Sequence, residues 1–352
     1  MRIALVSESF LPAVDGTTTT VKAVADRLID AGHVVLLVAM VPGLTSYRGC
    51  RVARISPDGL SSRVRATLEE FRPDLVHVTS PGRIGRKALK HSRRMAVPTV
   101  VVQLTPVTGV TADYWRAKVA ERADRMLVST PWMTTELEGL GVGSDLWIPG
   151  VDSRAFTPKL RDPWLHDAWA RAKSAGGPRV VVGYAGSLHR RHGVRRLQVL
   201  AEVPGIRLVV VGEGPQRGWL EDRLPGARFT GPLETGDLAR ALASMDVVVH
   251  PGTTQTCCHV LREAAASGVP VAAPRAGGAR HVVRHLETGL LFDPGDRHGL
   301  RDAVAALAAD RHRGLLGGRA RELAQGRDWR TAVDELLLDH YPRAFWRRPD
   351  AA

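Results

Sequence analysis

The segment PGTTQTCCHVLREAAASGVPVAAPRAGG, residues 251–278, contains the pattern that decides the fold. It reads as a strand end, a Gly/Thr-rich loop, a helix, a tight turn, a second strand and a Gly-Gly loop. Gly268 is expected to end the helix, and Val269–Ala273 has the composition of a buried parallel strand. The hydroxyl side chains that could cap the helix are Thr253, Thr254 and Thr256. The segment therefore predicts a strand–helix–strand unit of a parallel α/β sheet.

A helix that begins at the carboxyl end of a strand favours an anion, because its free N–H groups and its dipole face the ligand. Gln255 and Glu263 lie eight positions apart (263 − 255), which is about two helical turns. We expect Gln255 at the helix mouth, where it could contact a sugar. Glu263 would lie further along, where a carboxylate can accept from two ribose hydroxyls.

Strand-like apolar runs alternate with helical patterns along the whole chain. In the first half the runs are 2–6, 34–39, 52–55, 75–78, 99–102 and 126–128. In the second half they are 180–185, 208–211, 227–230, 247–250, 269–273 and a short 290–292 that could form a sheet edge. Pro149-Gly150 between the two series indicates a linker. This alternation predicts an α/β protein of doubly wound sheets.

The length of 352 residues suits two domains better than one. We expect an N-terminal Rossmann-like domain at residues 1–150 and a C-terminal one at residues 151–331. Each is too small to enclose a substrate alone, so a cleft between them is the expected site. An amphipathic helix at about residues 332–352 could pack back on the first domain.

Glycine-rich turns follow two strands of the second half. One contains Gly186 and Ser187 and continues into a basic cluster at Arg190, Arg191 and His192. The other is Gly212-Glu213-Gly214. Arginine side chains next to a glycine turn suit a diphosphate. Together with residues 252–259, these loops predict a binding site for phosphate and ribose.

Several other nucleotide and catalytic motifs are absent from the sequence. Arg217 occupies the position of the third glycine in a dinucleotide fingerprint, which disfavours an NAD enzyme. The chain has no Walker A sequence, no serine elbow, no HExxH and no CxxC. Cys257 and Cys258 are interpreted as small packing residues, although a helix N-terminus would lower the pKa of a nearby thiol. No metal site is predicted.

The first half offers fewer candidates. Gly16 follows the first strand and could let the backbone approach a ligand closely, while Thr17–Thr20 could cap the next helix and donate to phosphate. Gln103 and Thr105 follow the strand at 99–102. Ligands of open α/β sheets gather at such strand ends, so these two side chains are candidate acceptor contacts.

The formal net charge is +13, and arginine is spread along the whole chain. The densest basic cluster is Arg83, Arg86, Lys87, Lys90, Arg93 and Arg94, largely on one side of a predicted helix. It could be a solvated helix face, or it could attract an acidic substrate or an anionic membrane surface. No nucleic-acid-binding motif accompanies it. Three cysteines without zinc spacing and a start without a signal-peptide pattern favour a cytoplasmic protein, with peripheral contact at the inner membrane face as an option.

Eight motifs resemble the nucleotide-sugar-dependent glycosyltransferases of family 4 and cover nearly the whole chain. They are SESFLPAVDG at 7–16, PDLVHVTSP at 73–81, PGVDSRAFTP at 149–158, VGYAGSLHRRHGV at 182–194, VVVGEGP at 209–215, FTGPL at 229–233, SMDVVVHPG at 244–252 and HVLREAAASGVPVAAPRAGG at 259–278. The similarity is greatest to GDP-mannose-dependent α-mannosyltransferases. It implies the GT-B fold, in which two Rossmann-like domains face a central cleft.

The resemblance also implies roles for particular residues. The amides at the start of the signature helix, here Thr256, Cys257, Cys258 and His259, would hold the distal phosphate and sugar. Glu263 would bind the ribose, the segment with Gly231 and Leu233 would lie against the base, and the loop of Gly16 would approach the diphosphate. The chain departs from the family at several places. Gln255 replaces the first glutamate of the signature, Ser187 replaces an arginine, and His192 replaces a lysine. Thr105 stands where an acidic residue or a histidine is often found, and the segment between Thr108 and Ala123 is shorter than in the mannosyltransferases.

The resulting hypothesis is a retaining, metal-independent glycosyltransferase that needs no cofactor. It would use a nucleoside diphosphate sugar, with GDP favoured over UDP, and a small natural-product or lipid acceptor. Gln255 would orient the sugar, and Arg190, Arg191 and a protonated His192 would stabilise the leaving diphosphate. Two alternatives remain at this stage: a catalytically silent nucleotide-binding partner of another transferase, and a different GT-B enzyme such as an epimerase or a phosphorylase.

Overall fold

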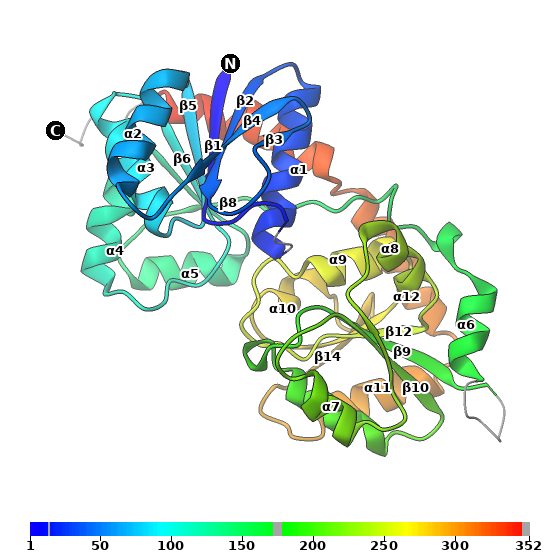
Figure 1. Cartoon of the computed structure of the whole chain (residues 1–352). Coiled ribbons are helices and arrows are strands. Elements are labelled where there is room, and N and C mark those ends of the chain that lie inside the picture. The colour runs from blue at the N-terminus through cyan, green and yellow to red at the C-terminus, as the bar shows by residue number, and fades with distance from the viewer. Residues whose placement is uncertain (13–14, 172–177, 347–352) are drawn as a thin grey trace. The chain divides into compact units, whose positions relative to one another are not determined.

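The structure is a computed structural model that describes residues 1–12, 15–171 and 178–346. It divides into two compact units. The N-terminal unit contains Met1–Gly150 and the chain from Trp329 onward, and the C-terminal unit contains Val151–Asp328 (Figure 1). Both units are α/β, as the sequence predicts.

The N-terminal unit is built on an eight-stranded sheet in the order β3-β4-β2-β1-β5-β6-β7-β8, and its strand pairs are parallel except for β3 with β4. The strands are β1 (Arg2–Ser7), β2 (Val34–Met40), β3 (Ser46–Tyr47), β4 (Cys50–Ile55), β5 (Leu75–Thr79), β6 (Thr99–Gln103), β7 (Arg125–Val128) and β8 (Asp145–Leu146). The helices between them are α1 (Gly16–Asp30), α2 (Leu60–Phe71), α3 (Arg83–Arg94), α4 (Ala112–Lys118) and α5 (Pro131–Gly139).

The C-terminal unit is built on a six-stranded parallel sheet in the order β11-β10-β9-β12-β13-β14. Its strands are β9 (Val180–Ala185), β10 (Ile206–Val211), β11 (Arg228–Gly231), β12 (Val247–Val249), β13 (Val271–Pro274) and β14 (Gly289–Phe292). Its helices are α6 (Pro163–Ala170), α7 (Arg217–Arg223), α8 (Thr235–Ala243), α9 (His259–Ala266), α10 (Ala279–Val282), α11 (Gly299–Ala309) and α12 (Arg313–Gln325). The short run at 290–292 is an edge strand, as the sequence suggests.

Strand β13 starts later than the apolar run at 269–273 predicts. The Val269 N–H donates to the carbonyl of Ala264 and so closes the end of α9, while Pro270 has no N–H to give to a strand pair. Gly268, with a φ of +72°, follows the last turn of α9. The expected helix end at Gly268 is therefore confirmed.

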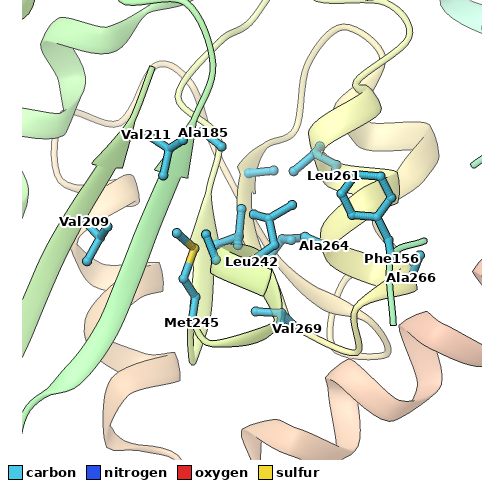
Figure 2. Packing of buried hydrophobic residues seen from close by; sticks show 14 of the residues in the cluster. Phe156, Ala185, Val209, Val211, Leu242, Met245, Leu261, Ala264, Ala266 and Val269 are labelled. Atoms are coloured by element: carbon cyan, nitrogen blue, oxygen red, sulfur yellow. The ribbon is translucent and has the colours of Figure 1, made fainter. Parts of the chain in front are cut away.

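Apolar layers cover both faces of the second sheet. Figure 2 shows one of them, a buried cluster that includes Leu261 and Ala264 of α9 and the strand residues Val209 and Val211. These side chains are fully or almost fully buried. Helix α9 is thus fixed against the sheet by its own apolar face, and its first turn lies where β12 ends.

The last part of the chain packs on the N-terminal unit. It runs from α13 (Trp329–Glu335) through a π turn at Leu336–His340 into α14 (Tyr341–Ala344). The buried Trp147 indole donates to the carbonyl of Ala332 at 2.8 Å, and buried Tyr341 lies 2.8 Å from Nδ1 of His77 in β5. Burial lowers the pKa of His77 to about 3, so this ring is neutral and serves the core.

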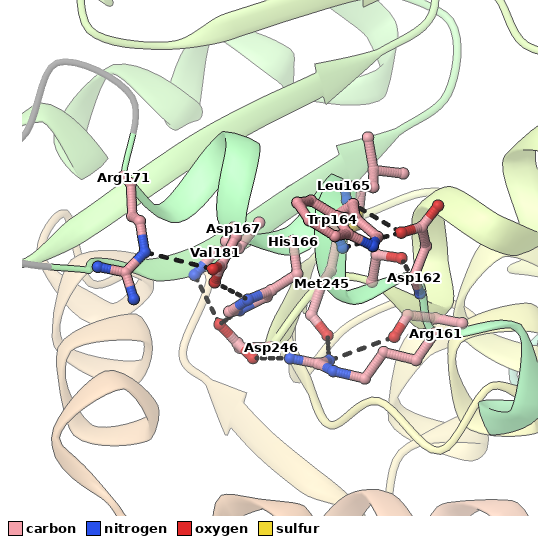
Figure 3. Close-up of polar contacts among 12 residues, drawn as sticks. Arg161, Asp162, Trp164, Leu165, His166, Asp167, Arg171, Val181, Met245 and Asp246 are labelled. Carbon is pink, nitrogen blue, oxygen red and sulfur yellow. Dashed lines mark hydrogen bonds and ion pairs between the residues drawn. The ribbon is translucent and has the colours of Figure 1, made fainter.

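A polar cluster around Asp246 fixes the start of the C-terminal unit to its sheet (Figure 3). The Asp246 carboxylate accepts from Arg161 at 2.8 Å, from the Val181 amide at 2.8 Å and from the His166 ring at 3.0 Å. Burial alone would raise the pKa of Asp246, but these hydrogen bonds outweigh burial and lower it. Asp246 is therefore an ionised carboxylate that joins three segments.

Candidate functional site

The glycine-rich loops of the C-terminal unit meet at the carboxyl edge of its sheet. The chain passes from β9 outward to β10 and β11, then returns to place β12 on the other side of β9. Such a switch point is where open α/β sheets bind ligands. It brings the loop after β9 beside the loop after β12: a Cβ on Gly193 would lie 2.7 Å from the Pro251 carbonyl oxygen.

The loop after β10 packs backbone to backbone against the loop after β9. The Leu188 amide donates to the Glu213 carbonyl at 2.8 Å, and the Gln216 amide donates to the Leu188 carbonyl at 2.9 Å. Gly212 has a φ of +130°, and a Cβ there would lie 2.0 Å from the Gly186 carbonyl oxygen. Only glycine permits this approach, and the three loops predicted from the sequence do lie together.

A fourth loop, Gly277-Gly278 after β13, belongs to the same cluster. The Gly278 amide donates to the Gln255 carbonyl at 2.7 Å, and a Cβ on Gly278 would overlap the Thr256 carbonyl oxygen. No role in the site was predicted for this glycine pair from the sequence. A Gly-Gly pair two residues beyond the end of a buried strand was the available signal.

The start of α9 differs from the prediction. Its N-cap is Cys258, which has a left-handed backbone (φ 48°, ψ 47°) and makes no side-chain capping bond. The predicted caps Thr253, Thr254 and Thr256 are therefore wrong. The loop is instead held by backbone contacts with the Gly277-Gly278 pair, which a search for capping side chains does not detect.

The two cysteines are packing residues. Both Cys257 and Cys258 are 6% exposed, and burial raises the pKa of the Cys258 thiol to about 12. The expected lowering by the helix N-terminus is wrong for Cys258, because desolvation of the thiolate is the stronger effect. A thiolate nucleophile at Cys258 is therefore disfavoured. The neighbouring His259 is partly exposed and is the first residue of α9.

Glu263 lies about one turn into α9, closer to the helix start than the spacing from Gln255 suggested, because the helix begins only at His259. Its side chain keeps some exposure, but burial still raises its pKa to about 7. The carboxyl group is thus close to half ionised at neutral pH. Its ability to accept two hydroxyl hydrogen bonds depends on pH in the physiological range.

We predict that the affinity of this site for a nucleoside diphosphate sugar falls about tenfold between pH 8 and pH 6. A carboxyl group with a pKa of about 7 is about 90% ionised at the upper limit and about 10% at the lower one, and the protonated form loses an acceptor for the ribose. Calorimetric titration with a nucleoside diphosphate sugar, whose phosphates do not titrate in this range, measures the effect. Glu263→Gln should bind weakly at both pH values; a wild-type affinity that does not change with pH would remove Glu263 from the site.

Arg190, Arg191 and His192 form a short 3-10 turn in the loop after β9. Both arginines are exposed, and His192 is partly buried. Burial, followed by the charges of Arg191 and His189, lowers the pKa of His192. A protonated His192 at neutral pH, as the sequence hypothesis required, is therefore disfavoured, and the fixed positive charge of this loop comes from the two arginines.

The remaining donor-site candidates lie at the ends of the same loops. Gly186 and Ser187 are exposed, and Gly186 has a φ of +147°. Gly231 ends β11 with a φ of +77°, and its carbonyl accepts from the Gly212 amide at 2.8 Å. Leu233 packs on the core of the unit. The segment at 231–233 therefore adjoins the loop that contains Glu213 and Gly214.

In the N-terminal unit the first helix is capped by Asp15. Its carboxylate accepts from the Thr18 amide at 2.8 Å, so Thr17–Thr20 do not cap α1, contrary to the prediction. Gly16 is the first residue of α1, and the Thr20 hydroxyl donates to the Gly16 carbonyl. The threonines lie inside the helix because Asp15, one residue earlier than Gly16, is the better cap.

Gln103 is buried and holds the backbone of Thr105 by a hydrogen bond. It is 4% exposed, and its amide nitrogen donates to the Thr105 carbonyl at 2.7 Å. Thr105 itself is exposed. Of the two predicted acceptor contacts, the structure leaves Thr105 accessible and encloses Gln103. Glu8, which follows β1, accepts from the Gly85 amide of α3 at 3.0 Å.

Helix α3 forms one wall of a basic groove of about 890 Å³. The groove is lined by the basic residues Arg65, Arg83, Arg86, Lys87, Lys90, Arg94, Lys118 and Arg122, with Tyr114 and a segment at 59–62. Arg86 lies 5.6 Å from the centre of the Tyr114 ring. The positive charge of Arg94, foremost, lowers the pKa of Lys90, which is the expected effect of crowded cations.

No helix within 1–12, 15–171 and 178–346 is long and apolar enough to cross a membrane. In the same part of the chain, no cluster of three His, Cys, Asp or Glu side chains could hold a metal ion.

Comparisons with known proteins give consistent results. Residues 14–154 match the family described as "Glycosyltransferase Family 4", and residues 179–310 match "Glycosyl transferases group 1". A "GDP-mannose-dependent alpha-mannosyltransferase" of Mycolicibacterium smegmatis is 39% identical over 99% of both chains. A protein of the same description from Mycobacterium tuberculosis is 37% identical over 100% of this chain and 99% of its own. Among solved structures, HepE of Anabaena in complex with UDP has a TM-score of 0.82 at 19% identity, covering 97% of this chain and all of that chain.

Proposed function

Because the chain belongs to glycosyltransferase family 4 and is a glycosyltransferase with the GT-B fold, we propose that it transfers mannose from GDP-mannose to a small natural-product or lipid acceptor. The observation that carries this proposal is the convergence of four glycine-containing loops at the switch point of the second sheet. The 37–39% identity to GDP-mannose-dependent enzymes over the full length supports GDP as the nucleotide. The C-terminal unit is then the donor-binding domain and the N-terminal unit is the acceptor-side domain.

In this proposal the donor lies along the carboxyl edge of the second sheet. Amides at residues 256–259 bind the distal phosphate, and Glu263 binds the ribose. The base lies against the segment at 231–233. Gly186, Ser187, Gly212, Glu213 and Gly214 shape the pocket. The close backbone packing of these loops supports a rigid pocket, which reduces the ordering cost of binding.

The proposed reaction retains the anomeric configuration. The acceptor hydroxyl or thiol attacks C1 of the sugar on the face from which the diphosphate leaves, and the diphosphate oxygen takes the acceptor proton. Arg190 and Arg191 balance the charge that develops on the leaving group, which supports a reaction that needs no metal. The lowered pKa of His192 removes it as a source of charge at neutral pH.

Retention can be tested without the natural acceptor. Slow hydrolysis of GDP-mannose by the enzyme, followed by proton NMR, should first release α-mannose, before mutarotation mixes the anomers. Initial release of β-mannose would contradict the retaining mechanism.

We predict that Arg191→Ala lowers turnover of GDP-mannose by at least about tenfold, because it removes one charge from the leaving-group site; tenfold corresponds to about 1.4 kcal/mol in the barrier. Arg196→Ala is the matched control, since Arg196 is exposed in the next turn of the same segment. GDP release under saturating donor measures both variants. Unchanged turnover in Arg191→Ala would exclude Arg191 from the mechanism.

A lipid acceptor would require contact with a membrane surface, and the basic groove beside α3 supports such contact. Its eight Lys and Arg residues face no acidic lining residue, and each basic group near an anionic surface contributes about 1 kcal/mol. We propose that this groove binds anionic headgroups. Co-sedimentation with phosphatidylglycerol vesicles at low salt should decrease strongly in Arg86→Glu/Lys90→Glu, whereas no binding by the wild type would favour a soluble natural-product acceptor.

A further inference from the structure

His192 and Gln255 meet in the donor site from two different loops. The side-chain amide of Gln255 contacts Nδ1 of His192, which joins the loop after β9 to the loop after β12. Glycine at position 252 allows the contact, because a Cβ there would lie 3.2 Å from the Gln255 carboxamide carbon and 3.2 Å from the His192 carbonyl oxygen. This is the pair of positions at which the chain departs from the family's glutamate and lysine.

The neighbours of His192 determine where its ring proton lies. Arg191 Nε lies 3.2 Å from His192 Nε2, and a guanidinium N–H can only donate. Nε2 must therefore offer its lone pair. A neutral imidazole carries one proton and one lone pair, so the proton lies on Nδ1, which faces Gln255.

The charged and titratable groups around the ring keep it neutral. Burial, followed by the charges of Arg191 and His189 from its own turn, lowers the pKa of His192. His250, the residue after β12, is the further titratable neighbour. His250 is 3% exposed, and burial, followed by the effect of His192, lowers its pKa to about 4. Neither ring therefore carries a charge at neutral pH.

This proton position fixes the orientation of the Gln255 amide. With the amide nitrogen against Nδ1, N–H donors would face both nitrogens of one neutral ring. Amide oxygen and nitrogen are distinguished by their hydrogen-bond network, and the network requires the carboxamide oxygen to accept from Nδ1–H. The N–H₂ group then faces the partly exposed side of Gln255.

We propose that Gln255 presents its amide N–H₂ group to the transferred sugar as a hydrogen-bond donor, and that His192 is the positioning residue that fixes this orientation. The proposal rests on the proposed function of the site. A carboxylate at this position accepts from a sugar hydroxyl, whereas the amide requires an oxygen on the sugar that can accept. The enzyme would therefore take a nucleoside diphosphate sugar whose hydroxyl or carboxylate oxygen accepts from Gln255.

The tautomer can be observed directly in the full chain. Two-bond ¹⁵N–¹H spectra of ¹⁵N-histidine-labelled protein at pH 7.5, with His192 assigned by its loss in His192→Asn, should show the Nδ1–H form. In Gln255→Glu the nearby carboxylate should raise the pKa of His192, a change that a merely structural contact would not produce. An Nε2–H ring, or a His192 that titrates identically in both proteins, overturns the proposal whether or not the enzyme turns over.

Kinetics test the contact with the sugar. Gln255→Glu should lower kcat/KM for GDP-mannose at least tenfold at pH 7.5 while changing the Kd of GDP less than threefold, because the lost donor faces the sugar. Arg196→Ala, at an exposed position outside the proposed donor contacts, is the control. A kcat/KM of Gln255→Glu within twofold of the wild type would show that the Gln255 amide accepts a hydrogen bond from the sugar rather than donating one. That result would overturn the proposal. Absence of both GDP binding and turnover in the wild type would instead refute the proposed function, and the ring spectra would still decide the orientation.

Discussion

Gly212→Ala should destabilise the C-terminal unit by about 3 kcal/mol and abolish donor binding. The backbone at Gly212 has a φ of +130°, which alanine adopts only with strain of about 1–3 kcal/mol, and the new Cβ would lie 2.0 Å from the Gly186 carbonyl oxygen. Because the Gly186 oxygen belongs to the backbone and the new Cβ is fixed to the Gly212 backbone, relief requires the loops after β9 and β10 to separate. Their separation would disrupt the diphosphate end of the proposed site.

The control for this variant is Gly218→Ala in α7. A Cβ on Gly218 meets nothing within 4 Å, and alanine is favoured over glycine in a helix by about 1 kcal/mol. Urea unfolding and calorimetric titration with GDP measure both proteins. A Gly212→Ala protein with wild-type stability and GDP affinity would show that the close packing of these loops is not required.

Asp246→Asn should lower the unfolding free energy of the C-terminal unit by about 2–3 kcal/mol, because hydrogen bonds to a charged group contribute about 1.5–3 kcal/mol. The neutral amide cannot accept from Arg161, His166 and the Val181 amide together. Asp167→Asn is the matched control. The Asp167 side chain is 54% exposed and pairs with Arg171, which is 62% exposed, so it should change stability by less than about 0.5 kcal/mol.

The effect of Asp246→Asn should also depend on pH. The pKa of Asp246 is lower in the folded chain than in the unfolded chain, so its stabilisation is present at neutral pH and is lost as the pH falls through the folded pKa. Urea unfolding at pH 7 and below about pH 4 should therefore show that the unfolding free energies of the wild type and of Asp246→Asn become more similar in acid. A difference that grows in acid would contradict this role.

Much of the fold could be predicted because hydrophobic patterning and glycine placement are local. The runs that became β9, β10 and β12 are almost entirely apolar, with Arg207 of β10 as the charged exception, as is typical of buried parallel strands. The glycine turns after them depend on backbone angles that other residues seldom adopt. These signals were sufficient to predict that the loops after β9, β10 and β12 of the C-terminal unit lie at one edge of its sheet.

Several errors concern contacts between distant segments. The N-cap of α9 could not be predicted from its threonines, because Gly278 binds the Gln255 carbonyl from across the site and thereby fixes the loop. The sequence likewise gave no sign that Gln255 would meet His192, 63 residues earlier. The pKa values of Cys258 and Glu263 follow from burial, which depends on the packed fold and cannot be read from neighbouring residues.

The central claim is that the C-terminal unit binds a GDP-linked sugar. Calorimetric titration of the full chain with GDP-mannose and with UDP-glucose at pH 8, where Glu263 is mostly ionised, tests it most directly. We predict saturable one-to-one binding of GDP-mannose, with UDP-glucose at least tenfold weaker, and loss of GDP-mannose binding in Gly212→Ala. Equal affinity for the two donors, or no binding of GDP-mannose, would contradict the account.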